Sequence, residues 1–199
     1  MPFEIELKAH LEDSQAVEGR LSALGAFCRS YKKSDSYWLP MQEGGEMSIP
    51  PAGVRVRRES GIDAGGTAHE SVLVTYKTKE ISDGIEVNDE REFEVSDALL
   101  FEDLLARLGL QKAICKEKQG RSWSVPPVLA EVSLVAGLGW FLELEIIADN
   151  DDRHIIEKSR GQLLSLLEKL EIQADRIEAM PYTAMLRELS IKEDQSGGK

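Results

Sequence analysis

Acidic and basic side chains recur at alternate positions in short segments along the chain. The carboxylates form Glu-x-Glu pairs at Glu4 and Glu6, Glu92 and Glu94, and Glu143 and Glu145. The candidate cations are Arg55, Arg57, Lys77, Lys116, Lys118 and Arg121. Arginine grips phosphate oxygens through paired hydrogen bonds, and lysine acts as a point charge. Carboxylates would repel a phosphate unless they hold Mg²⁺ or Mn²⁺, which bind oxygen and bridge to phosphates. Together the two residue types predict a site for a divalent metal and a polyphosphate, suited to phosphoryl or nucleotidyl transfer.

Each of these segments also has a structural interpretation. A single Glu-x-Glu or Lys-x-Lys pair on a strand is more often a solvent-facing surface than a site. The pattern recurs in most of the predicted strands, however, and acids and bases are largely segregated between them. A sheet with this pattern can leave its polar face to water, or it can curl so that the acids and bases line one cavity. The recurrence favours the cavity.

Period-two alternation of apolar and charged residues predicts the strands that carry these side chains. In residues 3–8 the apolar positions are odd and the charged positions are even. The same alternation runs through residues 53–58, 72–79, 90–95 and 141–147. The segments around 35–39, 112–118 and 121–134 also look extended. The sequence therefore predicts about eight strands, each with one apolar and one charged face.

Leucine-rich segments with helical spacing follow several of the strands. They span residues 14–24, 97–108 and 152–170, and a further helix is predicted near 182–190. Asp13 or Ser14 can cap the first helix, Ser96 or Asp97 the second, and the Asp149–Asp152 cluster the third. Glycine and proline predict loops at residues 40–52 and 59–70, the second a long mobile hairpin loop. Residues 191–199 are predicted to be a disordered tail. No linker divides the chain, so we expect a single α+β domain over residues 1–190.

Bulk composition excludes several classes of partner. The formal net charge of −12 disfavours binding to nucleic acids and to anionic membranes. Cys28 and Cys115 lack partners at metal-ligand spacing, which disfavours a zinc site and fits a reducing compartment. The N-terminus shows no secretory leader, and no apolar run approaches the length of a membrane span. We therefore expect a cytoplasmic protein.

An ordered series of motifs extends over about residues 3–185. It consists of Glu4-x-Glu6-x-Lys8, Asp35-x-Tyr37-Trp38, Arg55-x-Arg57, Thr75-x-Lys77, Glu92-x-Glu94, and Gly137-Leu138-Gly139 followed by Glu143-x-Glu145. This series resembles the CYTH family of class IV adenylate cyclases and triphosphatases, the triphosphate tunnel metalloenzymes. The segment from Asp35 to Trp38 and the element that ends at Glu145 are most similar to the cyclase-like branch.

The resemblance implies a fold, a ligand and a set of residue roles. The fold is an eight-stranded antiparallel closed β-barrel with helices outside, and the ligand is a triphosphate bound with Mg²⁺ or Mn²⁺. The implied catalytic residues are Glu4, Glu6 and Lys8. The implied metal ligands are Glu4, Glu6, Glu143 and Glu145. The implied phosphate-binding residues are Lys8, Arg55, Arg57, Lys77, Lys116, Lys118 and Arg121. The other implied tunnel residues are Asp35, Tyr37, Glu92 and Glu94. The resemblance leaves both a monomer and a homodimer open.

The chain departs from the family pattern at two places. Ser133 replaces an aspartate that the family often has, and Glu131 on the same face is a candidate substitute metal ligand. The basic motif of the sixth strand is blurred over residues 116–121, which leaves open which of its cations reaches the phosphates. The isolated histidines are interpreted as surface or loop residues, and Tyr182 as a packing residue of its helix.

Several functions remain open on the sequence. The leading hypothesis is conversion of ATP to cyclic AMP and pyrophosphate, in which the ribose 3′-oxygen attacks the α-phosphate. The rival enzyme hypothesis is a tripolyphosphatase or thiamine triphosphatase, in which water attacks the terminal phosphate. A third hypothesis is a non-catalytic module that binds polyphosphate or nucleotide, and a fourth is an acidic scaffold protein that binds neither.

Overall fold

A computed structural model describes residues 3–40, 53–82, 85–150 and 152–196, without the side chains of residues 77–82, 88–90 and 193–196. The strands are β1 (Phe3–His10), β2 (Ala26–Pro40), β3 (Val54–Asp63), β4 (Ala68–Ser82), β5 (Ile85–Glu94), β6 (Leu110–Val125), β7 (Val128–Val135) and β8 (Gly139–Ala148). The helices are α1 (Ser14–Leu24), α2 (Ala98–Arg107), α3 (Arg153–Lys169), the 3-10 helix η1 (Ala174–Arg176) and α4 (Tyr182–Ser196). None of the helices in these ranges is long and apolar enough to cross a bilayer.

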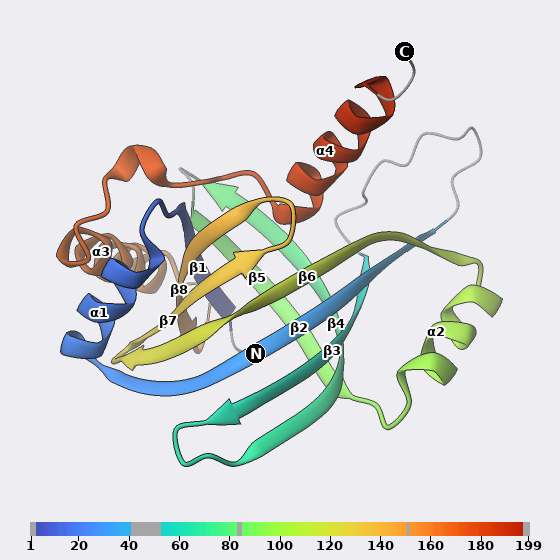
Figure 1. Cartoon of the computed structure of the whole chain (residues 1–199), viewed down its shortest axis with the longest axis horizontal. Coiled ribbons are helices and arrows are strands. Elements are labelled where there is room, and N and C mark those ends of the chain that lie inside the picture. Colours follow the sequence, from blue (N-terminus) through green and yellow to red (C-terminus); the bar gives the residue numbers. More distant parts are fainter. Residues whose placement is uncertain (1–2, 41–52, 83–84, 151, 197–199) are drawn as a thin grey trace.

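The strands pair in antiparallel fashion in the order β1-β5-β4-β3-β2-β6-β7-β8. Strand β8 pairs in turn with β1, with Glu6 opposite Glu145, so the hydrogen-bonded ring closes. The strands curve around a common interior, and the helices lie outside them (Figure 1). The predicted α+β architecture, an antiparallel sheet curled around its charged face, is therefore confirmed.

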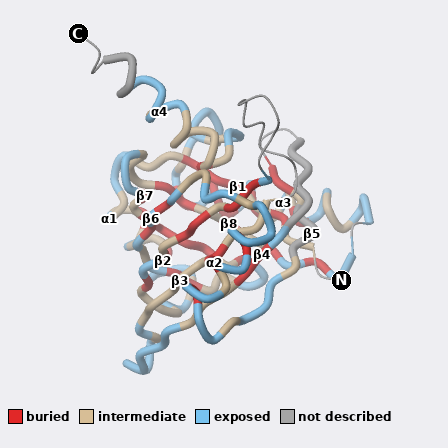
Figure 2. Tube along the Cα trace, turned by 90° about the vertical axis from the view of Figure 1, so that its right-hand side faces the viewer, coloured by how far each residue is buried: buried red, intermediate tan, exposed pale blue. Residues whose placement is uncertain are grey.

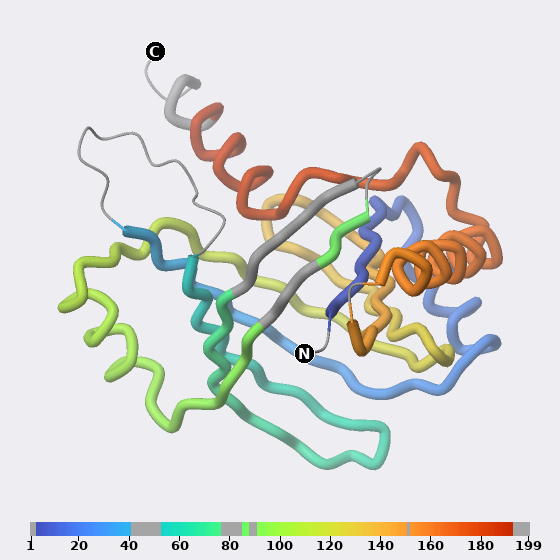
Figure 3. The backbone as a smooth tube through the Cα atoms, turned by 180° about the vertical axis from the view of Figure 1, so that it is seen from behind, coloured from blue at the N-terminus to red at the C-terminus, as the bar shows by residue number. Residues whose placement is uncertain are grey.

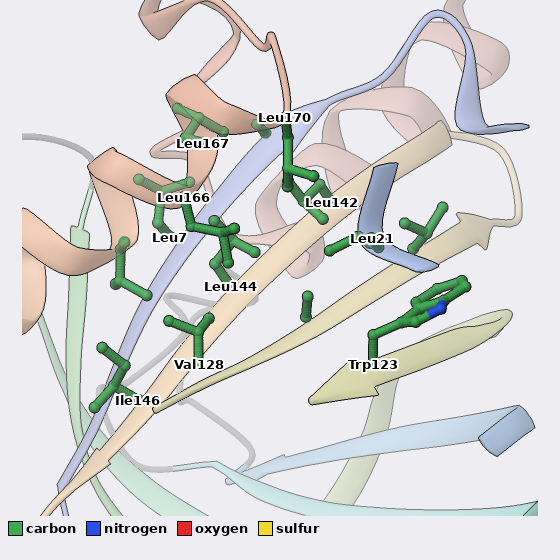
Figure 4. Close-up of a cluster of buried hydrophobic side chains, with 14 of the residues drawn as sticks. Leu7, Leu21, Trp123, Val128, Leu142, Leu144, Ile146, Leu166, Leu167 and Leu170 are labelled. Carbon is green, nitrogen blue, oxygen red and sulfur yellow. The ribbon is translucent and has the colours of Figure 1, made fainter. Parts of the chain in front are cut away.

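The apolar faces of the strands point mainly away from the interior, and much of their surface is buried beneath helices. The larger core joins β1, β7 and β8 to helices α1 and α3, and it includes Leu7, Leu21, Leu144 and Leu166 (Figure 4). In the tube coloured by burial, buried stretches are concentrated along the strands (Figure 2). The hydrophobic effect thus stabilises the outside of the ring and leaves the inside free for polar groups.

Among the predicted cap candidates, an aspartate caps each of the three helices. Asp13, Asp97 and Asp152 each precede a helix, and their side chains accept hydrogen bonds from backbone amides in the first helical turn at 2.8–3.0 Å. Such a cap satisfies an amide that the helix itself leaves without a partner. The local sequence therefore determines where α1, α2 and α3 begin.

A second core anchors α2 to the outside of β2, β3 and β4. Val56, Val74 and Leu105 pack there, and Glu102 of α2 is buried with them. The Glu102 carboxylate accepts hydrogen bonds from Ser36 Oγ at 2.8 Å, from Arg58 Nη1 at 3.0 Å and from Lys112 Nζ at 3.2 Å. Burial alone would raise the pKa of Glu102, but these donors lower it to about 2.

Glu102→Gln is expected to lower the free energy of unfolding by about 2–3 kcal/mol at pH 7. Because the pKa of Glu102 is depressed on folding, its contribution is present above its unfolded pKa of about 4.5 and is lost as the pH falls through about 2. Urea denaturation of both proteins at pH 7 and pH 3 measures this difference. The prediction would be contradicted if the difference in free energy of unfolding between the two proteins were as large at pH 3 as at pH 7.

Three expected boundaries were wrong. Residues 59–70 are not a long loop, because β3 continues to Asp63 and β4 starts at Ala68, with a short turn between them. Asp63 Oδ1 accepts a hydrogen bond from the Thr67 amide and closes that turn. The segment 121–134 contains parts of two strands, which are separated at Pro126 and Pro127. Helix α4 extends to Ser196 and therefore includes part of the tail that was expected to be disordered. Most of the loop predicted at 40–52 lies outside the described residues.

Candidate active site

The polar inner faces of the strands enclose a cavity of about 1030 Å³. All eight strands contribute to its lining, and so does the start of α4. The predicted site residues that line it are Glu4, Glu6, Lys8, Tyr37, Arg55, Arg57, Glu92, Lys116, Lys118, Glu131, Glu143 and Glu145. Residues from both ends of the sequence therefore meet in one space, as the alternation predicted.

Carboxylates gather where β5, β1 and β8 are adjacent. Glu6 lies opposite Glu86 on one side and opposite Glu145 on the other. Directly opposed residues in an antiparallel pair have Cβ atoms about 5 Å apart, and like charges at that distance destabilise the sheet. We call Glu86, Glu6 and Glu145 the acidic row. Lys8 Nζ lies 3.8 Å from Glu86 Oε1 and offsets part of this repulsion, and a divalent cation would relieve more of it.

The acidic row fits a metal ion that shares its ligands with a substrate. Within the described residues, no three carboxylate, histidine or cysteine side chains already converge as a complete metal cluster. Mg²⁺ is usually held by one or two carboxylates, with water and substrate phosphates completing the coordination. Glu6 and Glu145 on paired strands, with Glu4 and Glu143 at the alternate positions along those strands, match that requirement.

Cations gather on the other wall, and Asp35 of β2 holds two of them. Arg57 donates to both oxygens of Asp35, at 2.7 and 3.0 Å, and Lys116 Nζ lies 3.0 Å from Asp35 Oδ2. The Asp35 side chain is fully buried. Burial would raise the pKa of Asp35, but the charges of Lys116 and Arg57 hold it well below its usual range. Asp35 is therefore ionised, and its carboxylate orients the side chains of Arg57 and Lys116.

Glu131 of β7 makes a second cluster of charged contacts. Its carboxylate accepts hydrogen bonds from Lys33 Nζ at 2.9 Å, Lys118 Nζ at 3.0 Å and Tyr31 Oη at 2.9 Å. Lys118 also contacts Glu143. Burial lowers the pKa of Lys118 to about 7, although Glu131 opposes that shift. The contacts of Glu131 differ from its predicted role as a metal ligand, because both of its oxygens already accept hydrogen bonds from ammonium groups.

Arg121 and Glu94 do not belong to the cavity lining. Arg121 has the opposite parity to Lys116 and Lys118, so its side chain lies outside the ring and pairs with Glu18 of α1 at 2.6 Å. Glu94 is the last residue of β5 and is exposed. The predicted role of Lys77 falls on a side chain outside the described part of the chain.

Among the described residues, four charged residues of the cavity lining were missed by the predictions. Lys33 and Glu86 occupy inward positions of β2 and β5, at even spacing from Asp35 and Glu92, so the alternation would have found them if the predicted strands had been extended toward the N-terminus. Arg29 and Glu59 also line the cavity and form an ion pair with each other. All four of these residues lie outside the segments that the sequence predicted to be strands.

Comparison with known proteins agrees with this architecture. The model of the CYTH domain family matches residues 2–181, and the chain belongs to that family. A curated relative from Methanocaldococcus jannaschii, named "Putative adenylate cyclase MJ0240", is 25% identical over 90% of this chain and 96% of its own length.

Solved structures with the same fold come from several organisms. The PH1819 protein of Pyrococcus horikoshii has a TM-score of 0.75 and 24% identity, over 93% of this chain and 98% of that one. A Vibrio parahaemolyticus protein, named as a putative adenylate cyclase, has a TM-score of 0.75 and 16% identity, with the same coverage. HpAC1 from Hippeastrum, described as a cyclase candidate with dominant triphosphatase activity, has a TM-score of 0.58 and 14% identity over 94% of each chain.

Proposed function

We propose that this protein is a divalent-metal-dependent enzyme that acts on triphosphates, and that its reaction is the conversion of ATP to cyclic AMP and pyrophosphate. The observation that carries the proposal is the division of one cavity into an acidic row and a wall of cations. A site for anions alone has no use for opposed carboxylates, and a site for a metal alone has no use for buried arginines. A metal-bound polyphosphate needs both.

The residue roles follow from their positions. Glu4, Glu6, Glu143 and Glu145 would hold Mg²⁺ or Mn²⁺, which would supply charge neutralisation at the phosphate oxygens. Arg57 and Lys116, held by Asp35, would grip the phosphate chain from the opposite wall. Arg55 donates to Thr75 Oγ1 at 2.8 Å, which places its guanidinium beside Glu92. These cations would stabilise negative charge that develops on the leaving pyrophosphate.

Hydrolysis of a triphosphate is the second candidate. Members of the CYTH family act on triphosphates, and the names of the relatives include both activities. The same acids and cations serve either reaction, because both need charge neutralisation on the phosphate chain. The two differ in the nucleophile, which is the ribose 3′-oxygen for the cyclase and water for the triphosphatase.

Product analysis tests the proposal directly. The purified protein is incubated with ATP, tripolyphosphate or thiamine triphosphate, with Mg²⁺ or Mn²⁺, and the products are resolved by chromatography. Cyclic AMP with pyrophosphate is the expected result, and EDTA should abolish it. Orthophosphate without a cyclic product would replace the cyclase with a triphosphatase. No turnover of any substrate would favour the non-catalytic binding module.

A further inference from the structure

The first residue of α4 lies at the cavity rather than only within helix packing. Tyr182 lines the cavity together with Pro181, Thr183 and Ala184, although it follows the last strand by more than thirty residues. Its ring packs edge-on against Phe141 of β8, with ring centroids 4.9 Å apart. In the view from behind, α4 begins beside the strands and then leads away from them (Figure 3). The packing interpretation of Tyr182 is thus correct but incomplete.

Two cavity lysines lie against the Tyr182 ring. Lys8 Nζ is 4.9 Å from the ring centroid, and Lys116 Nζ is 5.1 Å from it. These lysines come from β1 and β6, so the ring sits between the strand that carries Glu6 and the wall that carries the cations. The Tyr182 ring therefore lies beside both the acidic row and the cations of the opposite wall.

The hydroxyl of Tyr182 is buried and has no hydrogen-bond partner within the described residues. Tyr182 as a whole is only 7% exposed. Buried hydroxyl groups almost always have a partner, so one without a partner requires an explanation. Burial raises the pKa of Tyr182 well above its usual value, and the negative charge of Glu6 adds to the effect. The hydroxyl is therefore protonated and available as a donor.

The segment before α4 is held in place by contacts to β1. The Glu178 amide donates to the Lys8 carbonyl oxygen at 2.8 Å, and the Glu178 carboxylate contacts His10 Nε2 at 3.0 Å. The same carboxylate accepts a hydrogen bond from the Met180 amide at 2.7 Å. These contacts fix the chain two residues before Tyr182, so the position of the ring is determined before any ligand binds.

We propose that Tyr182 is a ligand-binding residue whose hydroxyl donates a hydrogen bond to a non-bridging phosphate oxygen drawn in by Lys8 and Lys116. The inference rests on the proposed function, because it assigns a further contact to the same triphosphate. The first turn of α4 supports it, since the amides of a helix N-terminus favour an anion. A bound phosphate oxygen would also supply the partner that the buried hydroxyl lacks.

Tyr182→Phe tests the proposal because it removes the hydroxyl and keeps the ring. The probe is diimidotriphosphate with Mg²⁺, in which nitrogen replaces the bridging oxygens and prevents hydrolysis, and binding is measured by calorimetry. The dissociation constant is expected to rise about tenfold or more, the range for a hydrogen bond to a charged group. The matched control is Tyr76→Phe, the same change at a residue that is 49% exposed, where the affinity should stay at the wild-type value.

Thermal unfolding without ligand gives a second readout, because the variant that binds the probe more weakly is expected to be the more stable protein. Removing a buried hydroxyl without a partner should raise the melting temperature of Tyr182→Phe, by about 2–4 °C. A lower melting temperature with an unchanged dissociation constant would show a purely structural role and overturn the inference. Equal affinities of wild type and variant would overturn it while the proposed function stands. If the wild type itself does not bind the probe, the inference and the proposed function fall together.

Discussion

Glu6→Gln is expected to abolish metal-dependent turnover, with a loss of about 100-fold or more. Glu6 is the central member of the acidic row, with Glu86 and Glu145 directly opposite it on the two neighbouring strands. Replacing its carboxylate removes the proposed metal ligand at the centre of this row. The measurement is the initial rate of product formation from the substrate identified by product analysis, with Mg²⁺ or Mn²⁺ varied over a wide range.

The stability of Glu6→Gln separates a functional loss from misfolding. Removing one of three neighbouring negative charges should leave the metal-free melting temperature unchanged or raise it. The matched control is Glu94→Gln, the same change on an exposed residue at the end of β5, which should keep the wild-type rate. A wild-type rate in Glu6→Gln would refute the metal assignment, whatever its stability.

Asp35→Asn is expected to lower the free energy of unfolding by about 3–5 kcal/mol, the cost of removing one partner of a buried ion pair. The Asp35 carboxylate pairs with both Arg57 and Lys116, which contact it at 2.7 and 3.0 Å. Without its charge, two buried cations face each other with less compensation. Urea denaturation at pH 7 measures the loss.

A triphosphate should partly replace the missing carboxylate. The stabilisation that tripolyphosphate gives is therefore expected to be larger for Asp35→Asn than for the wild type. The matched control is Asp103→Asn, which breaks the exposed pair with Arg107 and should cost less than about 1 kcal/mol. Equal free energies of unfolding for Asp35→Asn and Asp103→Asn would show that Asp35 does not stabilise Arg57 and Lys116 as its contacts indicate.

Most of the site residues were predicted from the alternation of apolar and charged residues along the strands. In β1 and β8 the charged residues keep to one parity, so Glu4 and Glu6 could be assigned to one face of β1, and Glu143 and Glu145 to one face of β8, directly. In β6, charged residues occur at both parities. Lys118 and Arg121 were both predicted to bind phosphate, but Arg121 is paired with the core residue Val132 and forms an ion pair with Glu18, so it points outward.

Local patterns also failed where a strand continues through polar residues. Glu59 and Gly61 lie in β3, although their composition is typical of a loop, because hydrogen bonding to β2 and β4 extends the strand beyond its apolar part. Strand propensity depends on such neighbours more than on the residue itself. The inward positions of Arg29 and Glu59 could not be assigned before that pairing was known.

The sequence by itself determined the strands, their two faces, the helix starts and the identity of most charged residues in the cavity, because these depend on periodicity and on local capping. Only the tertiary structure decided that β8 closes on β1 and that the charged face is the inner one. That choice depends on the helices, which bury the apolar faces from outside. The cavity position of Tyr182 was likewise decided in three dimensions, because it depends on contacts between Glu178 and β1 that join residues about 170 positions apart.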